Sequence, residues 1–334
     1  MTVFGIGIGG DMRTIADLAR TAEELGYESV WVAETSWTPF VQAALACHVT
    51  NTITVGTDIA LAFPRSPTIT AMTARDLAEL SNERFILGLG SQVKRVNEFR
   101  FSVPFEHPAP KMGEYIEVVR KVLATFGGEP IDHQGRFYTV TMPPFPGAGA
   151  VEKLPIYLAA MNEKMAETAG RVADGVLIHP MTSPKYIAEV VRPAVERGAT
   201  GAGRDPADVS ISTSVILQVN DDVEVARRQA AYQIGFYATT RTYKRVLEIH
   251  GFGDLVDPLR EAHGRKDLDA MADIATPMVD TYSITGPVAE CKEQLASFDG
   301  VVDRIILGGS WIGPDRSGIV ENYLRIMQNF GQPA

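Results

Sequence analysis

The sequence predicts an α/β fold, a (β/α)₈ barrel with a β-hairpin insertion and a helical insertion before the last strand. Three observations predict it. Eight short apolar or β-branched runs alternate with segments of helical periodicity along the 334 residues. Residues 53–92 are patterned as strand, helix and strand, a unit that is almost always a right-handed parallel crossover. A hairpin pattern and one long helical stretch interrupt the alternation.

The first half of the chain is expected to supply four strands. Asp11 is a plausible N-cap for the first helix, and Pro64 and Pro67 end the third strand. Residues 93–110 form a mixed-charge stretch, expected as an irregular loop that is either functional or mobile. The strands are expected at 2–8, 29–33, 53–63 and 84–90, and the helices at 11–25, up to about 49, at 68–80 and at 111–126.

The second half is expected to supply the other four strands and both insertions. Gln134-Gly135 lies between two extended arms, which predicts a hairpin over 131–142, followed by a proline- and glycine-rich loop at 143–149. Residues 221–275 show helical segments without a convincing strand, and 276–284 is expected to be extended or lid-like. The strands are expected at 154–159, 175–178, 209–219 and 303–307, and the helices at 163–173, 183–197, 287–298 and 318–330.

These elements favour one TIM-barrel domain over residues 1–334, with about 221–284 as a helical insertion within it. The loop at 143–149 is not a domain boundary on this interpretation, because strands continue in the same rhythm beyond it. An open doubly wound sheet in two halves is the competing architecture.

Composition narrows the class of protein. The chain carries 31 basic and 41 acidic residues, a net charge of −10, which argues against nucleic acid and anionic membranes as partners. No apolar run is long enough to span a membrane, and the N-terminus lacks a signal-peptide pattern. Cys47 and Cys291 are far apart, and the six histidines show no metal-ligand spacing, so neither a disulfide nor a metal site is expected. A cytoplasmic protein that acts on a small molecule is the expectation.

Two glycine motifs could contact a cofactor. Residues 5–10 fit GxGxxG, but they coincide with the first strand itself, so a glycine-rich barrel strand is favoured over a dinucleotide-binding turn. Gly88-Leu89-Gly90-Ser91-Gln92 ends the fourth strand, where glycine would let the backbone approach a ligand. A tight turn without a ligand is the alternative for this second motif.

Three ionisable residues follow strands at the edge where barrels bind their ligands. Asp58 interrupts an apolar strand, and it is either functional or a structural carboxylate satisfied by the backbone or by Arg65. Glu34 ends the second strand and has an exposed loop position as its alternative. His179 ends the sixth strand, where an imidazole could protonate a substrate or contact a phosphate, or simply lie on the surface. Trp37 and Trp311 follow strand ends and could wall an apolar pocket.

Several segments together resemble the luciferase-like monooxygenase family, in particular its deazaflavin-dependent (coenzyme F420) oxidoreductases. They are residues 16–34, 53–92, 112–122, the GRFY hairpin at 135–138, and 154–176. The resemblance implies a (β/α)₈ barrel with an extra hairpin and a helical insertion, and a homodimer. It also implies a non-proline cis peptide after the third strand, here Asp58-Ile59, which backs the ring of the cofactor.

The resemblance further implies which residues hold the cofactor. Asp58 and Ile59 would support the ring, Glu34 would lie near it, and residues at the ends of the fourth and fifth strands would follow its ribityl and phosphate chain. Those residues are Gly90, Ser91, Gln92, Ala160, Met161 and Asn162. The chain also departs from the family. Thr35 and Val93 stand where the sugar-phosphate dehydrogenase branch has a catalytic histidine and glutamate, and Met161-Asn162 replaces a frequent Gly-Gly.

The expected function is that of a coenzyme F420-dependent oxidoreductase that transfers a hydride between the C5 atom of the deazaflavin and an unidentified organic substrate. The cofactor would carry the redox chemistry while the protein positions it and excludes water. Glu34 and His179 are the candidates for managing the proton. An FMN-dependent monooxygenase of the same family is the first alternative, and a cofactor carrier or sensor without turnover is an alternative of another class.

Overall fold

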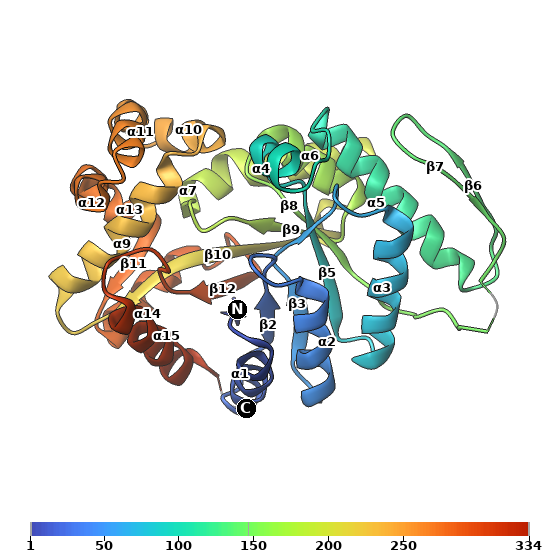
Figure 1. Cartoon of the computed structure of the whole chain (residues 1–334), viewed down its shortest axis with the longest axis horizontal. Helices are drawn as coiled ribbons and strands as arrows, with labels where there is room; N and C mark the ends of the chain where they lie inside the picture. The colour runs from blue at the N-terminus through green and yellow to red at the C-terminus, as the bar shows by residue number, and fades with distance from the viewer. Residues whose placement is uncertain (1, 146, 333–334) are drawn as a thin grey trace.

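A closed barrel of eight parallel strands forms the centre of the molecule (Figure 1). The computed structural model describes residues 2–145 and 147–332. β10 pairs with both β9 and β12, which closes the ring, so the predicted barrel is confirmed and the open doubly wound sheet is wrong. Round the barrel the strands are β1 (Val3–Ile8), β2 (Ser29–Val32), β3 (Thr54–Thr57), β5 (Phe85–Gly90), β8 (Ile156–Ala159), β9 (Gly175–Ile178), β10 (Ser210–Val219) and β12 (Arg304–Gly308).

Helices surround the barrel because each has an apolar face to bury against it. α1 begins after Asp11, whose carboxylate accepts the N–H groups of Arg13 and Thr14, so the predicted N-cap is confirmed. These helices are α1 (Met12–Glu24), α2 (Pro39–Val49), α3 (Pro67–Leu80), α5 (Pro108–Thr125), α6 (Glu163–Val172), α7 (Pro184–Tyr186), α8 (Arg192–Gly201), α14 (Val288–Leu295) and α15 (Arg316–Phe330).

Three segments differ from the prediction. The expected strand at 53–63 is interrupted at Asp58-Ile59 and resumes as β4 (Ala60–Leu61), which pairs with β5. The expected loop at 93–110 contains α4 (Lys94–Arg100), and α5 begins at Pro108, because proline suits the first turn of a helix. The segment at 276–284 is extended only in its last two residues, which begin β11 (Ser283–Gly286) and pair with β10, because the residues before them are helical and include α13 (Val279–Tyr282).

Both insertions of the predicted fold are present. The hairpin of β6 (Ile131–Gln134) and β7 (Thr139–Met142) projects to one side in Figure 1, and Glu114 of α5 ties it down by accepting the N–H groups of Phe137 and Tyr138. The helices α9 (Val223–Ala238), α10 (Lys244–Glu248), α11 (Val256–Gly264) and α12 (Leu268–Ala275) separate β10 from β12. Residue 146, in the predicted 143–149 loop, lies outside the described residues, and the division into domains stays a prediction.

The interior of the barrel is packed rather than hollow. Trp31, Ile86, Tyr157, Leu177 and Ile306 face one another from five strands and form a buried cluster. Towards the start of the strands, Arg304 pairs with Glu28 at 2.7 Å, which satisfies a guanidinium that is almost fully buried. This packed core is the floor beneath the carboxyl ends of the strands.

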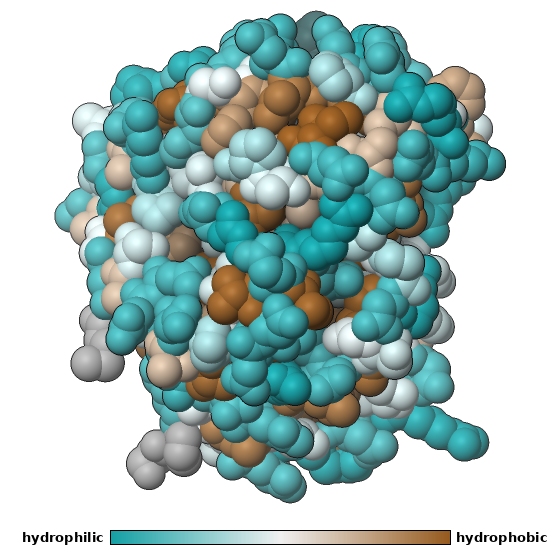
Figure 2. Space-filling view, turned by 90° about the vertical axis from the view of Figure 1, so that its left-hand side faces the viewer, coloured by the Kyte–Doolittle hydropathy of each residue, from teal (hydrophilic) through white to brown (hydrophobic). Residues whose placement is uncertain are grey.

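The surface over the last third of the chain is mostly hydrophilic (Figure 2). Large apolar side chains are exposed there one at a time, among them Val225, Leu268 and Val320. Single exposed apolar residues are ordinary on a protein surface. Within residues 2–145 and 147–332, no helix is long and apolar enough to cross a membrane.

Candidate active site

Towards the carboxyl ends of the strands, the positions that face the barrel interior become small or polar. Side chains alternate along a strand, so the inward positions continue from those of Trp31, Tyr157 and Leu177. A Cβ atom at Gly7 or Gly308 would meet only one backbone oxygen, at 3.7 or 3.8 Å, which is ordinary contact, so a small group has room above each of these two glycines. The inward positions of this upper layer are Gly7, Asp58, Gly90, Ala159, His179, Ser214 and Gly308.

Asp58 reaches across this layer. Three strands separate β3 from β10 in either direction round the barrel, yet the hydroxyl of Ser214 donates to Oδ2 of Asp58 at 2.8 Å. Burial raises the pKa of Asp58 to about 6, although the hydrogen bond from Ser214 opposes the rise. Arg65, the expected structural partner of Asp58, pairs with Glu34 instead.

The peptide bond between Asp58 and Ile59 is cis, which confirms the prediction. The bulge that contains it explains the glycines of β5. A Cβ atom at Gly88 would lie 1.8 Å from the carbonyl oxygen of Thr57, and one at Gly90 would lie 2.0 Å from Cδ1 of Ile59. The nearest neighbours of these two glycines are therefore protein atoms of the adjacent strand, where the sequence suggested a ligand.

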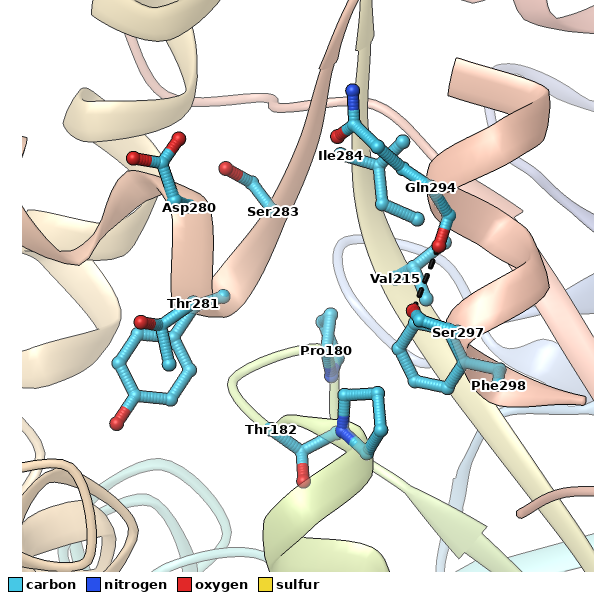
Figure 3. A pocket seen from close by; sticks show the side chains of 12 residues that line it. Pro180, Thr182, Val215, Asp280, Thr281, Ser283, Ile284, Gln294, Ser297 and Phe298 are labelled. Atoms are coloured by element: carbon cyan, nitrogen blue, oxygen red, sulfur yellow. Dashed lines mark hydrogen bonds between the residues drawn. The ribbon is translucent and has the colours of Figure 1, made fainter. Parts of the chain in front are cut away.

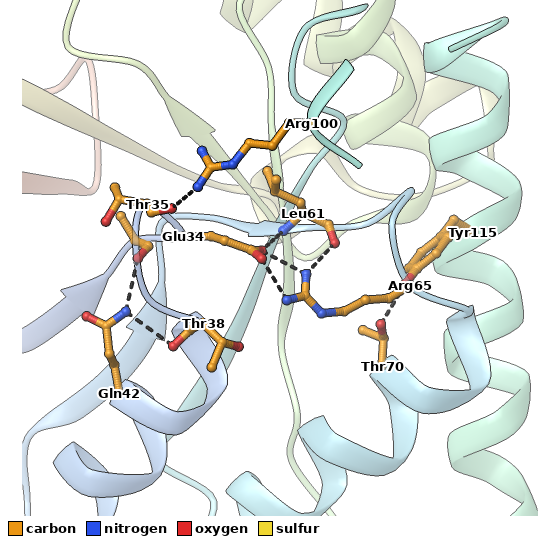
Figure 4. Close-up of polar contacts among 10 residues, drawn as sticks. Glu34, Thr35, Thr38, Gln42, Leu61, Arg65, Thr70, Arg100 and Tyr115 are labelled. Carbon is orange, nitrogen blue, oxygen red and sulfur yellow. Dashed lines mark hydrogen bonds and ion pairs between the residues drawn. The ribbon is translucent and has the colours of Figure 1, made fainter. Parts of the chain in front are cut away.

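Glu34 holds the segment that follows the bulge (Figure 4). Its two carboxylate oxygens each accept a hydrogen bond of 2.7 Å from the guanidinium of Arg65, and Oε2 also accepts the N–H of Leu61 at 2.8 Å. The backbone N–H of Glu34 donates to the carbonyl of Ile59. The Glu34 side chain is only 9% exposed, so the alternative of an exposed loop position is wrong. Its catalytic role stays a prediction.

His179 lies on the opposite side of the barrel from Glu34, and the two do not form one cluster. Its Nδ1 accepts the N–H of Met181 at 3.1 Å, so the proton of the neutral ring is on Nε2. Its ring packs between Tyr237 and Tyr243, with centroids 4.4 and 4.9 Å away. Burial lowers the pKa of His179 to about 3, so the ring is neutral at physiological pH and can donate a hydrogen bond.

An aromatic rim from the helical insertion borders the site. The hydroxyl of Tyr237 on α9 accepts the indole N–H of Trp311 at 3.1 Å, and burial raises the pKa of Tyr237 to about 12. Trp311 is half exposed, as suits the pocket wall that the sequence suggested. Sequence reasoning missed Ser214, Tyr237 and Tyr243. Serines occupy every second position of β10 up to Ser214, a pattern that could have indicated a polar face turned towards the barrel interior. A single tyrosine on a helix gives no such indication of a site.

The predicted cofactor residues lie at the ends of β5 and β8, which are neighbouring strands. Their polar side chains are occupied locally, since Oε1 of Gln92 accepts the N–H of Val93 and Oδ1 of Asn162 caps α6. The first N–H groups of α6 have no partner within the helix, as in any helix, and this is the kind of place where phosphates bind. These residues fit a ribityl–phosphate chain through their backbone, and their roles stay predictions.

Outside this layer, neither a metal site nor a ligand cavity stands out among the described residues. In the described part of the chain, no group of histidine, cysteine, aspartate and glutamate could hold a metal ion. A cavity of about 260 Å³ lies between the segment after β9, α13, β11 and α14 (Figure 3). It contains none of the candidate residues, and the hydroxyls of Ser283 and Ser297 on its wall donate to backbone carbonyls. Nothing about this cavity indicates a ligand.

The chain is similar to known proteins over most of its length. The luciferase-like monooxygenase family matches residues 4–303. An uncharacterised protein of Mycobacterium tuberculosis is 38% identical over 300 residues, which are 87% of this chain and 88% of that protein. A 5,10-methylenetetrahydromethanopterin reductase of Methanolobus tindarius is 30% identical over 319 residues, which are 92% of this chain and 93% of the reductase.

Solved structures agree on the fold. The coenzyme F420-dependent tetrahydromethanopterin reductase of Methanopyrus kandleri has a TM-score of 0.82 at 23% identity, over 98% of each chain. The oxygenating component of a type II Baeyer–Villiger monooxygenase from Pseudomonas putida, in complex with FMN, has a TM-score of 0.67 at 16% identity, over 99% of this chain and 98% of that one. The solved structures of this fold thus include a reductase and a monooxygenase. This chain belongs to the luciferase-like monooxygenase family.

Proposed function

We propose that this chain is an oxidoreductase that binds the deazaflavin coenzyme F420 and transfers a hydride between its C5 atom and a small organic substrate. The observation that carries the proposal is the lack of side chains at Gly7 and Gly308, where an added Cβ atom would meet only a backbone oxygen, in a layer bordered by the Asp58–Ile59 bulge. Such a layer fits a flat ring lying on the packed core, because glycines leave room for it and the bulge gives it a wall. The carboxyl end of a barrel is also where these folds bind their ligands.

The names of relatives support the deazaflavin over FMN. The Methanolobus tindarius protein, at 30% identity, is named as a reductase, and the Methanopyrus kandleri reductase of the same fold is named as coenzyme F420-dependent. The bound cofactor would supply the centre that accepts or gives the hydride. The protein would hold the ring in place and keep water away from it.

The chain's own residues divide this work in the proposal. Asp58 and Ile59 border the ring. The ends of β5 and β8 hold the ribityl and phosphate chain through Gly90, Ser91, Gln92, Ala160, Met161 and Asn162, helped by the first turn of α6. His179 donates a hydrogen bond from Nε2. Glu34 acts as a positioning residue, since Arg65 and Leu61 already use both of its carboxylate oxygens.

The test is a binding titration of the apoprotein with coenzyme F420 and, separately, with FMN, followed by tryptophan fluorescence. Trp31 lies in the layer below the expected ring and Trp311 at the rim, so a bound ring should quench both. We expect micromolar or tighter binding of coenzyme F420 and much weaker binding of FMN. Gly308→Val should abolish the binding of coenzyme F420, because its side chain would fill the upper layer of the barrel. Gly201→Val on α8, where a Cβ atom meets open space, is the control and should leave binding unchanged.

The other outcomes separate the alternatives. Preference for FMN, with oxygen uptake when the flavin is reduced, would make the chain an FMN-dependent monooxygenase. Tight coenzyme F420 binding with no turnover across a panel of alcohols, amines and carbonyl compounds would leave a carrier or sensor. Binding of neither cofactor would overturn the proposal. The homodimer and the cytoplasmic location expected from the sequence stay predictions.

A further inference from the structure

Hydride transfer at a carbon that bears a hydroxyl or an amine leaves one proton to be placed. This inference rests on the proposed function. The residue that exchanges the proton needs three properties: a position in the upper layer of the barrel, an atom free to accept, and a charge that changes near neutral pH. Asp58 and His179 are the ionisable residues at inward positions of this layer, and Glu34 lies two residues beyond the end of β2, so these three are the candidates.

In two of the three, every candidate acceptor atom is already engaged. Both carboxylate oxygens of Glu34 are bound by the guanidinium of Arg65, at 2.7 Å each. In His179 the N–H of Met181 occupies Nδ1, and Nε2 already carries the proton of the neutral ring. His179 can therefore orient a substrate by donating a hydrogen bond, but it cannot take up a proton without first losing the bond to Met181.

Asp58 has the free atom. Its Oδ2 accepts from Ser214, and within residues 2–145 and 147–332 no group donates to Oδ1. Asp58 is mostly buried, but its Oδ1 keeps some exposed surface, since it is not among the fully enclosed side-chain atoms without a partner in the described residues. The groups that face it are Ser214 from β10 and, from α9, Tyr237, whose pKa it raises. No described cation pairs with Asp58, so nothing holds its carboxyl permanently ionised.

We propose that Asp58 is the catalytic residue that exchanges the substrate proton and that Ser214 positions it. In the oxidative direction the O–H or N–H bond of the substrate breaks and its proton goes to Oδ1 of Asp58. The adjacent C–H bond breaks with its electron pair, which leaves as hydride to the deazaflavin. The substrate is oxidised to a carbonyl or imine, and the deazaflavin is reduced. Asp58 then returns the proton to solvent, and the reverse reaction uses the same groups.

The electrostatic environment agrees with this geometry. Burial raises the pKa of Asp58 to about 6, so both of its charge states are populated near neutral pH. The Ser214 hydroxyl stabilises the carboxylate and keeps the pKa from rising further. A ring placed beside Asp58 would exclude some of the surrounding water and shift the pKa of Asp58 further towards neutral, while leaving Oδ1 open to the substrate.

The first test needs no cofactor. The apoprotein is labelled with ¹³C at aspartate carboxyls, the Asp58 signal is assigned by its loss in Asp58→Asn, and its shift is followed with pH. We expect an inflection near pH 6. Ser214→Ala should move it upward by roughly half a unit or more, because a hydrogen bond to the charged form is lost. Ser214→Thr, which keeps the hydroxyl, should restore it. An inflection below about pH 4.5, the range of an unperturbed aspartate, would overturn the inference.

The second test measures protons taken up when coenzyme F420 binds, by calorimetry at pH 6.5 in two buffers of different ionisation enthalpy. We expect uptake of roughly half a proton that Asp58→Asn removes, because the ring beside the carboxyl excludes water and raises its pKa. Asp208→Asn, an exposed aspartate before β10, is the matched control and should leave the uptake unchanged. Equal uptake in wild type and Asp58→Asn would overturn the role of Asp58. Failure of the wild type to bind coenzyme F420 would instead overturn the proposed function.

Discussion

The side chain of Ile59 lies directly over Gly90, with its Cδ1 atom 2.0 Å from the position that a Cβ atom would take there. The next nearest atoms, Cγ1 of Ile59 and Cβ of Ala159, are each 3.3 Å from that position. β3 and β5 are neighbours in the barrel, so the bulge of one strand and the glycine of the other form one packing unit. This unit is the wall against which we place the cofactor ring.

The first prediction concerns this packing. Gly90→Ala should lower the free energy of unfolding by roughly 1–3 kcal/mol, because an extra methyl group overpacks a full site. Ile59→Val removes the clashing Cδ1 atom and should restore most of the loss in the double variant. Urea unfolding of the four proteins in this cycle measures the coupling.

Gly201→Ala is the matched control, because a Cβ atom there meets open space. It should leave stability unchanged or raise it slightly. A Gly90→Ala protein as stable as wild type, or one that Ile59→Val fails to rescue, would contradict the packing argument.

The second prediction concerns the pair of Glu34 and Arg65. Their side chains are 9% and 20% exposed, so removing one partner leaves a charge that is poorly solvated. Arg65→Met should destabilise the protein by roughly 3 kcal/mol, and Glu34→Gln by less, because the amide still accepts the N–H of Leu61. Thermal unfolding and the coenzyme titration should change together, since the pair holds the segment behind the ring. A Glu34→Gln protein with unchanged stability and binding but lost turnover would support the catalytic role for Glu34 instead.

The sequence was sufficient to predict the barrel because the signals for it are local. Each strand is a short apolar run, and each helix has a 3.6-residue apolar period that is visible without the rest of the chain. The cis peptide bond between Asp58 and Ile59 could also be predicted, though only through the resemblance to the family. β11 was missed because a four-residue strand is defined by its partner, here β10, rather than by its own pattern, and β4 was predicted as part of one continuous strand with β3.

The site could be predicted only in part, because its contacts join residues that are distant in the chain. Asp58 and Ser214 are 156 residues apart and meet only when the barrel closes. Arg65 pairs with Glu34 and not with Asp58, and this choice of partner depends on the path of the chain after the bulge. The residue types alone do not show which of two carboxylates, Glu34 or Asp58, a nearby arginine will pair with. The predicted positions at the strand ends were therefore more secure than the predicted roles.

The third prediction is a pH dependence of stability that comes from Asp58. Its pKa is about 6 in the folded protein and near 3.8 when unfolded, so folding favours its protonated form. This contribution is complete below pH 3.8 and is lost as the pH rises through 6. Asp58→Asn should therefore be more stable than wild type at pH 8, by roughly 2–3 kcal/mol, with the difference shrinking towards pH 4. Denaturant unfolding of both proteins from pH 4 to 8 measures it, and a constant difference would contradict the raised pKa.

The fourth prediction has the opposite sign and concerns His179. Burial lowers its pKa from 6.5 to about 3, so folding favours the neutral ring. This contribution is present above pH 6.5 and is lost as the pH falls towards 3. The free energy of unfolding of wild type, relative to that of His179→Gln, should fall by roughly 2–3 kcal/mol between pH 7.5 and 4.5. The reason is that the histidine is protonated in the unfolded chain at pH 4.5 but stays neutral in the folded protein. Groups that titrate alike in both proteins cancel in this comparison.

Nitrogen NMR gives an independent measurement of the same property. Between pH 5 and 8 the two ring nitrogens of His179 should keep the shifts of a neutral ring protonated on Nε2, because Nδ1 stays bound to the N–H of Met181. His179→Gln identifies the signal by its disappearance. A His179 signal that titrates near pH 6.5 would show that the imidazole can carry a proton at working pH. The proton exchange assigned to Asp58 would then have to be shared with, or returned to, the histidine.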